Sequence, residues 1–183
     1  MFTFDMERVT DAPEITKLLN IVFGADRREK ASYALRQDAE PITALCQVVR
    51  HEGKVAASIR YWPIYISDLI TGERCPALLL GPLAVDPAVQ GAGAGSSLMI
   101  RTLSAAATLG HRRIVLVGDA CFYGRFGFVS TLPSYITLPG GRDARRLLVK
   151  QSALLPSLPA VGRVEPSLEV MHAPVQNDLA LAS

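Results

Sequence analysis

A run of six residues, Gln90-Gly91-Ala92-Gly93-Ala94-Gly95, has the side chains in this sequence that most directly suggest chemistry. Its glycines and alanines are so small that the backbone can come close to a bound group. A helix is predicted to follow, and the amides at a helix start carry the positive end of its dipole toward the loop. Phosphate oxygens are the groups that such amides bind. Tight packing of the helix start against a sheet is a simpler explanation of the same residues.

Two known phosphate-binding loops fit this run poorly. A Walker-type loop has a lysine and then a serine or threonine after its last glycine, but Gly95 is followed by Ser96 and Ser97. A dinucleotide-binding loop directly follows a strand and has glycine at its sixth place, where Ser96 stands. The spacer 86–89 also separates the predicted strand from the glycines. A nucleotide-dependent oxidoreductase stays an alternative, because Asp119 ends the next predicted strand, near where a ribose-binding acid would lie.

Composition and charge exclude several other classes of protein. The 183 residues are 49% hydrophobic, which is enough for one globular domain, and a formal net charge of +2 provides no basic field for nucleic acid or an anionic membrane. The first residues lack a signal-peptide pattern and no apolar run approaches the roughly 20 residues of a membrane span, so we expect a cytoplasmic protein. No metal site is expected, because the three cysteines and three histidines are widely scattered.

The elements that must position the glycine-rich run follow from hydrophobic periodicity. A first helix is predicted from Asp11, which forms a capping-box pattern with Glu14, to Gly24, where a left-handed residue would end it. A second helix is predicted over 28–37. Strands are predicted over 44–51, 55–66 and 77–85, because these segments are rich in β-branched and aromatic residues and are separated by turn signals.

A helix over 96–109 and an apolar strand over 113–118 complete the central region. The composition of this strand predicts burial on both faces. Antiparallel hairpins are thus followed by one β-α-β crossover, which indicates a mixed α/β domain. One further strand is predicted within RRLLVK, residues 145–150.

Two motifs at compatible spacing resemble those of one family. The first is Val85-Asp86-Pro87 after a strand, followed by Gln-x-x-Gly-x-Gly at the start of a helix, and the second is GDACFYGRFGFVS, which begins at Gly118. Together they resemble the pyrophosphate-binding motif and a later motif of the GNAT acyltransferase superfamily, and LGPLAVDP with YGRFGF is particularly similar to its bacterial YhbS-like branch. The resemblance covers roughly 4–139, and it departs from the family at Cys121, where a proline or another small residue is expected.

The resemblance implies the fold and the co-substrate. The fold is a GNAT-type acyl-CoA N-acyltransferase fold, with a mixed, mostly antiparallel central sheet, one β-α-β crossover and flanking helices, and the co-substrate is acetyl-CoA. The pantetheine arm would pair with the main chain of Leu83, Ala84 and Val85. The pyrophosphate would bind the loop and helix start formed by Gln90, Gly91, Ala92, Gly93, Ala94, Gly95 and Ser96. Physical chemistry agrees, since an unpaired strand edge can bind a peptide-like arm, and Gly81-Pro82 suggests a local break in the strand.

The implied reaction is direct attack of a neutral amine on the thioester. The resemblance assigns Tyr123 as the acid that protonates the leaving thiolate, although a tyrosine packed on the sheet explains the same residue. Asp119 is our candidate for binding the amine or for a water-mediated base, or it simply caps the helix that follows. A nucleophilic Cys121 is disfavoured, because no histidine is near it in sequence. For Arg125, pairing with an acid and contact with the phosphoadenosine end both stay open.

The acceptor site is expected beside the strand break, completed by FGADRREK (23–30) and by the segment after Phe128. Asp26, Arg27 and Arg28 could contact a charged acceptor or form only a solvated surface. We expect the acceptor to be a small-molecule amine or an amine of a peptide or protein, expect no nucleic-acid or membrane partner, and allow for a homodimer.

Residues 1–140 are predicted to form the acetyltransferase core. Residues 141–183 are predicted to be an extension that packs on this core or completes it, with a frayed end. An acyl-CoA sensor that has kept the loop but lost turnover is the main alternative to an enzyme.

Overall fold

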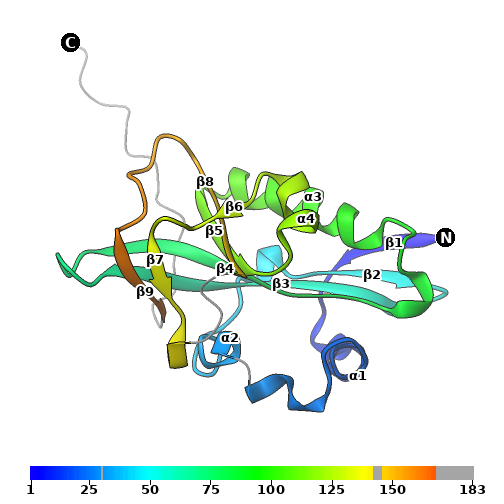
Figure 1. Cartoon of the computed structure of the whole chain (residues 1–183). Coiled ribbons are helices and arrows are strands. Elements are labelled where there is room, and N and C mark those ends of the chain that lie inside the picture. Colours follow the sequence, from blue (N-terminus) through cyan, green and yellow to red (C-terminus); the bar gives the residue numbers. More distant parts are fainter. Residues whose placement is uncertain (30, 142–145, 168–183) are drawn as a thin grey trace, which may run out of the picture.

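A computed structural model describes residues 1–29, 31–141 and 146–167 of the chain. The described strands form one nine-stranded sheet in the order β1-β2-β3-β4-β5-β8-β6, with β9 beside β3 and β7 beside β9 (Figure 1). The strands are β1 (Phe2–Met6), β2 (Gln47–His51), β3 (Lys54–Asp68), β4 (Arg74–Val85), β5 (Arg113–Val117), β6 (Val129–Ser130), β7 (Tyr135–Thr137), β8 (Leu147–Gln151) and β9 (Val161–Pro166).

Helices cover both faces of this sheet. In Figure 1, α1 and α2 lie on one face and α3 and α4 on the other. The α-helices are α1 (Ala12–Phe23), α2 (Ala31–Ala34), α3 (Ala94–Thr108) and α4 (Ala120–Tyr123). Among the described helices, none is long and apolar enough to cross a membrane.

The predicted hairpins and crossover are confirmed. Strands β1 to β4 pair as antiparallel neighbours, and the β2–β3 turn has positive φ at both Glu52 (52°) and Gly53 (78°), as a tight hairpin turn requires. Strands β4 and β5 pair in parallel, and α3 forms the crossover between them. The fold is therefore the mixed, mostly antiparallel α/β fold expected from the sequence.

The two central parallel strands diverge after a short contact. Their register joins only Leu78 to Ile114 and Leu79 to Val115, whereas β4 continues to Val85 and β5 is paired with its other neighbour, β8, along its whole length. The β3–β4 ladder shifts register at the same level, opposite the predicted break at Gly81-Pro82. One edge of the last residues of β4 is thus left without β5 as a partner.

Separate apolar clusters hold the helices on the sheet. Leu98 and Met99 of α3 are fully buried against β3 and β4, and the Tyr61 hydroxyl lies 2.8 Å from Thr102 Oγ1. On the opposite face, Ile15 and Leu18 of α1 pack against β2, β3 and β4. Helix α3, and with it the glycine-rich run, is therefore firmly attached to β4.

The first helix forms as predicted, but the prediction of a capping box at its start is wrong. The Asp11 side chain makes no cap bond to α1; it accepts from the backbone amide of Arg8 at 2.9 Å and forms an ion pair with Arg50 at 2.8 Å. Glu14 accepts a hydrogen bond from the backbone amide of Val55 at 2.7 Å. Both carboxylates thus connect α1 to the sheet, where tertiary partners outcompete the local cap.

Other departures from the predicted elements are limited. The helix expected over 28–37 is replaced by a 3-10 turn at Ala25–Glu29 and the short α2. Strand β1 was not predicted, although its residues Phe2–Met6 alternate between apolar and polar side chains as in a half-buried strand. Its partner β2 lies far along the chain, so the local sequence does not identify this pairing, in which Asp5 is held by Arg50 at 3.0 Å.

The chain after residue 140 contributes to the same sheet. Strand β8 lies between β5 and β6, and β9 pairs with β3 beyond the end of β2. The division into 1–140 and 141–183 stays a prediction, and the predicted frayed end lies outside the described residues.

Candidate active site

The glycine-rich run forms an exposed loop that leads into α3. Gly91 and Gly93 have φ values of 83° and 86°, a conformation that favours glycine. The first hydrogen bond within the helix is donated by the Ser97 amide to the Gly93 carbonyl at 2.9 Å. The amides before Ser97 therefore have no acceptor within the helix. Gly93 is the N-cap and has no side chain with which to cap them. This helix start can therefore bind an anion with its backbone.

Two contacts place this helix start against the end of β4. A Cβ added to Gly95 would lie only 3.0 Å from Val85 Cγ2, so glycine allows the close approach of helix and strand. The Gln90 side-chain amide donates to the Val85 carbonyl at 3.4 Å. The loop and the strand end thus form one continuous surface.

The free edge of β4 follows from the alternation of its ladder with β3. The Asp86 amide donates to the Ala56 carbonyl at 2.8 Å, and Ala84 is paired with Ser58. In an antiparallel ladder the hydrogen-bonding groups of successive residues face opposite edges, so those of Leu83 and Val85 face away from β3. Of the three predicted strand residues, these two can pair with an extended ligand, while Ala84 bonds to β3.

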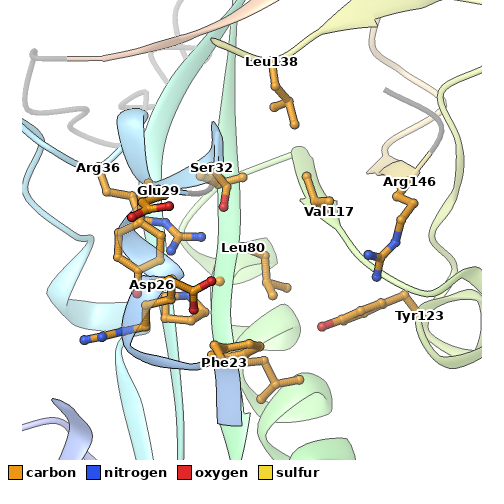
Figure 2. A pocket seen from close by; sticks show the side chains of 16 residues that line it. Phe23, Asp26, Glu29, Ser32, Arg36, Leu80, Val117, Tyr123, Leu138 and Arg146 are labelled. Carbon is orange, nitrogen blue, oxygen red and sulfur yellow. The ribbon is translucent and has the colours of Figure 1, made fainter. Parts of the chain in front are cut away.

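A cavity of about 590 Å³ opens beside this free edge (Figure 2). Three parts of the fold enclose it: the segment from α1 to α2, the strand β4 at its break, and residues at the ends of β5, α4, β7 and β8. The lining residues are Phe23, Asp26, Arg27, Glu29, Ser32, Tyr33, Arg36, Leu79, Leu80, Gly81, Pro82, Leu83, Val117, Tyr123, Leu138 and Arg146. The cavity thus includes both segments from which the acceptor site was predicted, 23–30 and the chain after Phe128.

Tyr123 points into the cavity from the side opposite α1 and α2 (Figure 2). Its ring packs at right angles to Phe122, with centroids 4.9 Å apart, and lies so close to Gly118 that an added Cβ there would be 2.7 Å from Tyr123 Cδ2. Burial raises the pKa of Tyr123 to about 12, against the opposing effect of the Arg146 charge. The phenol is therefore protonated at neutral pH and available as a proton donor.

The other residues of the second motif have structural contacts. Asp119 is exposed and accepts from the Cys121 amide at 2.8 Å, so it caps α4, and it is not among the cavity residues. Cys121 is a free, exposed thiol. Arg125 lies over the ring of Phe122, at 4.8 Å from the centroid, and has no ion pair with an acid among the described residues, while contact with the phosphoadenosine end stays a prediction. A catalytic role for Asp119 stays a prediction.

The cavity wall formed by the segment from α1 to α2 is strongly charged. Asp26 and Glu29 are exposed acids, whereas Arg27 is buried and donates to Asn20 Oδ1. Arg28 is exposed and does not line the cavity. Of the charged cluster that the sequence suggested, Asp26 and Arg27 therefore reach the cavity.

Two arginines of the cavity were missed by sequence reasoning. Arg36 follows α2 and Arg146 precedes β8, far apart in the chain, and no motif or spacing connects them. Only the pairing of β8 with β5 brings Arg146 beside Tyr123. Among the described residues, no group of three or more His, Cys, Asp or Glu side chains could hold a metal ion.

Comparisons with known proteins identify one family. The family model described as acetyltransferase (GNAT) domain matches residues 43–130. The uncharacterized N-acetyltransferase YhbS of Escherichia coli strain K12 is 31% identical over 118 residues, which cover 64% of this chain and 68% of that protein. The crystal structure of E. coli YhbS in complex with CoA has a TM-score of 0.70 and 26% identity, covering 88% of each chain. The structure of a GNAT family acetyltransferase from Brucella melitensis in complex with acetyl-CoA has a TM-score of 0.63 and 27% identity, covering 91% of this chain and 96% of that one.

Proposed function

The chain belongs to the GNAT acetyltransferase superfamily, and from this premise we propose that it transfers the acetyl group of acetyl-CoA directly to a primary amine in a ternary complex. The family resemblance stated from the sequence is confirmed. The identity of the acceptor and the roles of individual residues are our proposal.

One observation carries this proposal: the uncapped start of α3, the free edge of β4 and the protonated Tyr123 follow one another along the surface of the molecule. The start of α3 suits the pyrophosphate of CoA, because its backbone amides and its dipole favour negative charge. The free main-chain groups of Leu83 and Val85 suit the amide-containing pantetheine arm. Leu83 also lines the cavity that contains Tyr123. A molecule extended along this surface would have its thioester end in the cavity.

The chemistry needs few protein groups. Acetyl-CoA supplies a thioester carbon that a neutral amine can attack, so a C–N bond forms, the C–S bond breaks and the amine loses a proton to solvent. Tyr123 donates its hydroxyl proton to the leaving sulfur and is reprotonated from solvent. Its high pKa keeps it protonated for this step, and a positioned acid of this kind contributes about 10²-fold or more to the rate.

The test compares Tyr123→Phe with the wild-type protein, using acetyl-CoA and a panel of primary amines. We expect kcat to fall about 100-fold while the dissociation constant for acetyl-CoA, measured by calorimetry, stays unchanged. Tyr135→Phe is a matched control, because Tyr135 is 59% exposed in β7 and does not line the cavity. An unchanged kcat in Tyr123→Phe would remove this residue from the mechanism.

The same assay, with a further calorimetric titration of NADH, distinguishes the alternatives. Binding of acetyl-CoA without transfer to any amine would favour the non-catalytic sensor, and binding of NADH instead of acetyl-CoA would favour the oxidoreductase. A cytoplasmic location and a homodimer stay predictions.

A further inference from the structure

We propose that the amine acceptor also carries a carboxylate, as an amino acid does, and that Arg36 binds this carboxylate on the wall opposite Tyr123. The inference rests on the proposed function and specifies the class of its acceptor. The guanidinium of Arg36 and the hydroxyl of Tyr123 enter the cavity from opposite walls (Figure 2).

Arg36 is held in place by its neighbours. Its guanidinium carbon lies 4.8 Å from the centre of the Tyr33 ring, and its Nη2 atom lies 3.3 Å from where a Cβ of Gly81 would be. The absence of a side chain at Gly81 thus lets the guanidinium rest against the break in β4. This charge is preorganised beside the free edge of the strand, where the reacting groups would meet.

Arg36 is half-buried, and its charge has no acidic partner among the described residues. The ion pairs there involve Arg50 and Arg60, and no carboxylate is paired with Arg36. Its Nε is shut off from solvent and has no hydrogen-bond partner among those residues. Burial lowers the pKa of Arg36 to about 10, so the group is still charged at neutral pH. A half-buried cation of this kind is stabilised by an anionic ligand.

The two acids on the same wall are a weaker argument for a cationic acceptor than Arg36 is for a carboxylate. Asp26 and Glu29 are exposed, so water already solvates their charges. A cationic acceptor such as a polyamine would gain little from them, because exposed ion pairs contribute little. The cavity has two other cations. Arg27 donates to Asn20 Oδ1, and Arg146 adds to the positive field on the side of Tyr123.

The size of the cavity suits a small molecule. A volume of about 590 Å³ lies within the range of roughly 300 to 1,000 Å³ in which small ligands bind. An N-terminal amine or a lysine within a protein has no carboxylate next to it, so these acceptors would leave Arg36 without an anion. The observations therefore favour a free amino acid or a related amino carboxylate.

The test measures acetylation of the twenty common amino acids, their carboxamides, and the carboxylate-free amines putrescine and tyramine. We expect at least one amino acid to be acetylated with a kcat/KM about 100-fold above that of its carboxamide. In Arg36→Gln this preference should be lost through a higher KM for the amino acid, while the rate with the carboxamide and the affinity for acetyl-CoA stay unchanged. Arg28→Gln is the matched control, because Arg28 is an exposed arginine just before α2 that lies outside the cavity.

Three results would overturn the inference. If carboxamides or carboxylate-free amines are acetylated as well as amino acids, the proposed function stands and the role of Arg36 fails. If acetyl-CoA binds and no amine of any series is acetylated, the proposed function fails and the inference fails with it. An equal loss with amino acid and carboxamide in Arg36→Gln would assign the arginine a merely structural role.

Discussion

Tyr123 depends on the absence of a side chain at Gly118. A Cβ at Gly118 would lie 2.7 Å from Tyr123 Cδ2 and 2.9 Å from Leu116 Cδ1, and Leu116 is fixed in the core. The ring of Tyr123 would have to move, and its hydroxyl with it. At the residue scale, the position of the proposed acid is thus set by a glycine that does not itself line the cavity.

Gly118→Ala should therefore lower kcat without weakening the binding of acetyl-CoA. A misplacement of about 1 Å can cost about 100-fold in rate, so we expect a decrease of this order with an unchanged calorimetric affinity for acetyl-CoA. Gly124→Ala is the control, because Gly124 has φ −57° and no atom within contact distance of an added Cβ. A normal kcat in Gly118→Ala would show that the tyrosine ring is not critical.

The pH dependence of kcat gives a second prediction for Tyr123. An acid is active only while protonated, so the rate is retained below its pKa and lost above it. Because burial raises this pKa to about 12, kcat at saturating acceptor should not fall between about pH 7 and about pH 10. A loss of rate in this range that disappears in Tyr123→Phe would contradict the assignment.

The sequence predicted the residues of the site where they belong to local motifs, and missed them where they do not. The glycine-rich run and Tyr123 each lie within a dozen residues of characteristic spacing. Arg36 and Arg146 are brought to the cavity by the packing of α2 and by the pairing of β8, which no local pattern records. Asp119 illustrates the converse, because its contact in the structure is the helix cap that the sequence also allowed.

Helix α3 is the element on which co-substrate binding depends. Gly93 and Gly95 are poor positions for testing this, since Gly93 has a positive φ and a side chain on Gly95 would meet Val85. Ala92 is exposed in the loop directly before Gly93 and has no positive φ. It allows a charge to be added at the helix start without strain.

Ala92→Glu should weaken acetyl-CoA binding about 10- to 100-fold, because it places a negative charge where the pyrophosphate would lie. The same charge is favourable toward the dipole of α3, so thermal stability should be unchanged or slightly higher. Ser104→Glu, on an exposed position further along α3, is the control for net charge and should bind normally. Equal affinities in the two variants would exclude the helix start as the anion site.

The main helices and central strands were predicted correctly from hydrophobic periodicity, whereas a local capping signal failed. Periodicity predicted α1, α3 and the central strands, because each has a continuous apolar face that must be buried. The capping box at Asp11 and Glu14 failed, because both carboxylates have partners on the sheet, at Arg50 and at the backbone of Val55. A local signal is overridden when a tertiary partner competes for the same group.

At the scale of the whole molecule, the sheet links the chain after residue 140 to the site. Strand β8 fills the position between β5 and β6, and its side chains Leu147, Leu148 and Val149 are buried. It also carries the chain from Arg146, at the cavity, back along β5. We therefore expect this region to unfold together with the rest of the sheet.

Leu148→Ala tests this expectation. Leu148 is 2% exposed and is paired with Leu116 of β5 and Ser130 of β6, so its truncation should lower the free energy of unfolding by about 3 kcal/mol, in one cooperative transition. Leu154→Ala is the control, since Leu154 is 81% exposed and its loss should cost almost nothing. Urea unfolding, followed by both far-UV circular dichroism and tryptophan fluorescence, measures these effects. The fluorescence of Trp62 reports on β3, which is separated from β8 in the sheet by β4 and β5. If Leu148→Ala moved only the circular dichroism transition and left that of Trp62 in place, residues 1–140 would be a separate folding unit, and the pairing of β5 with β8 would not determine the stability of the cavity.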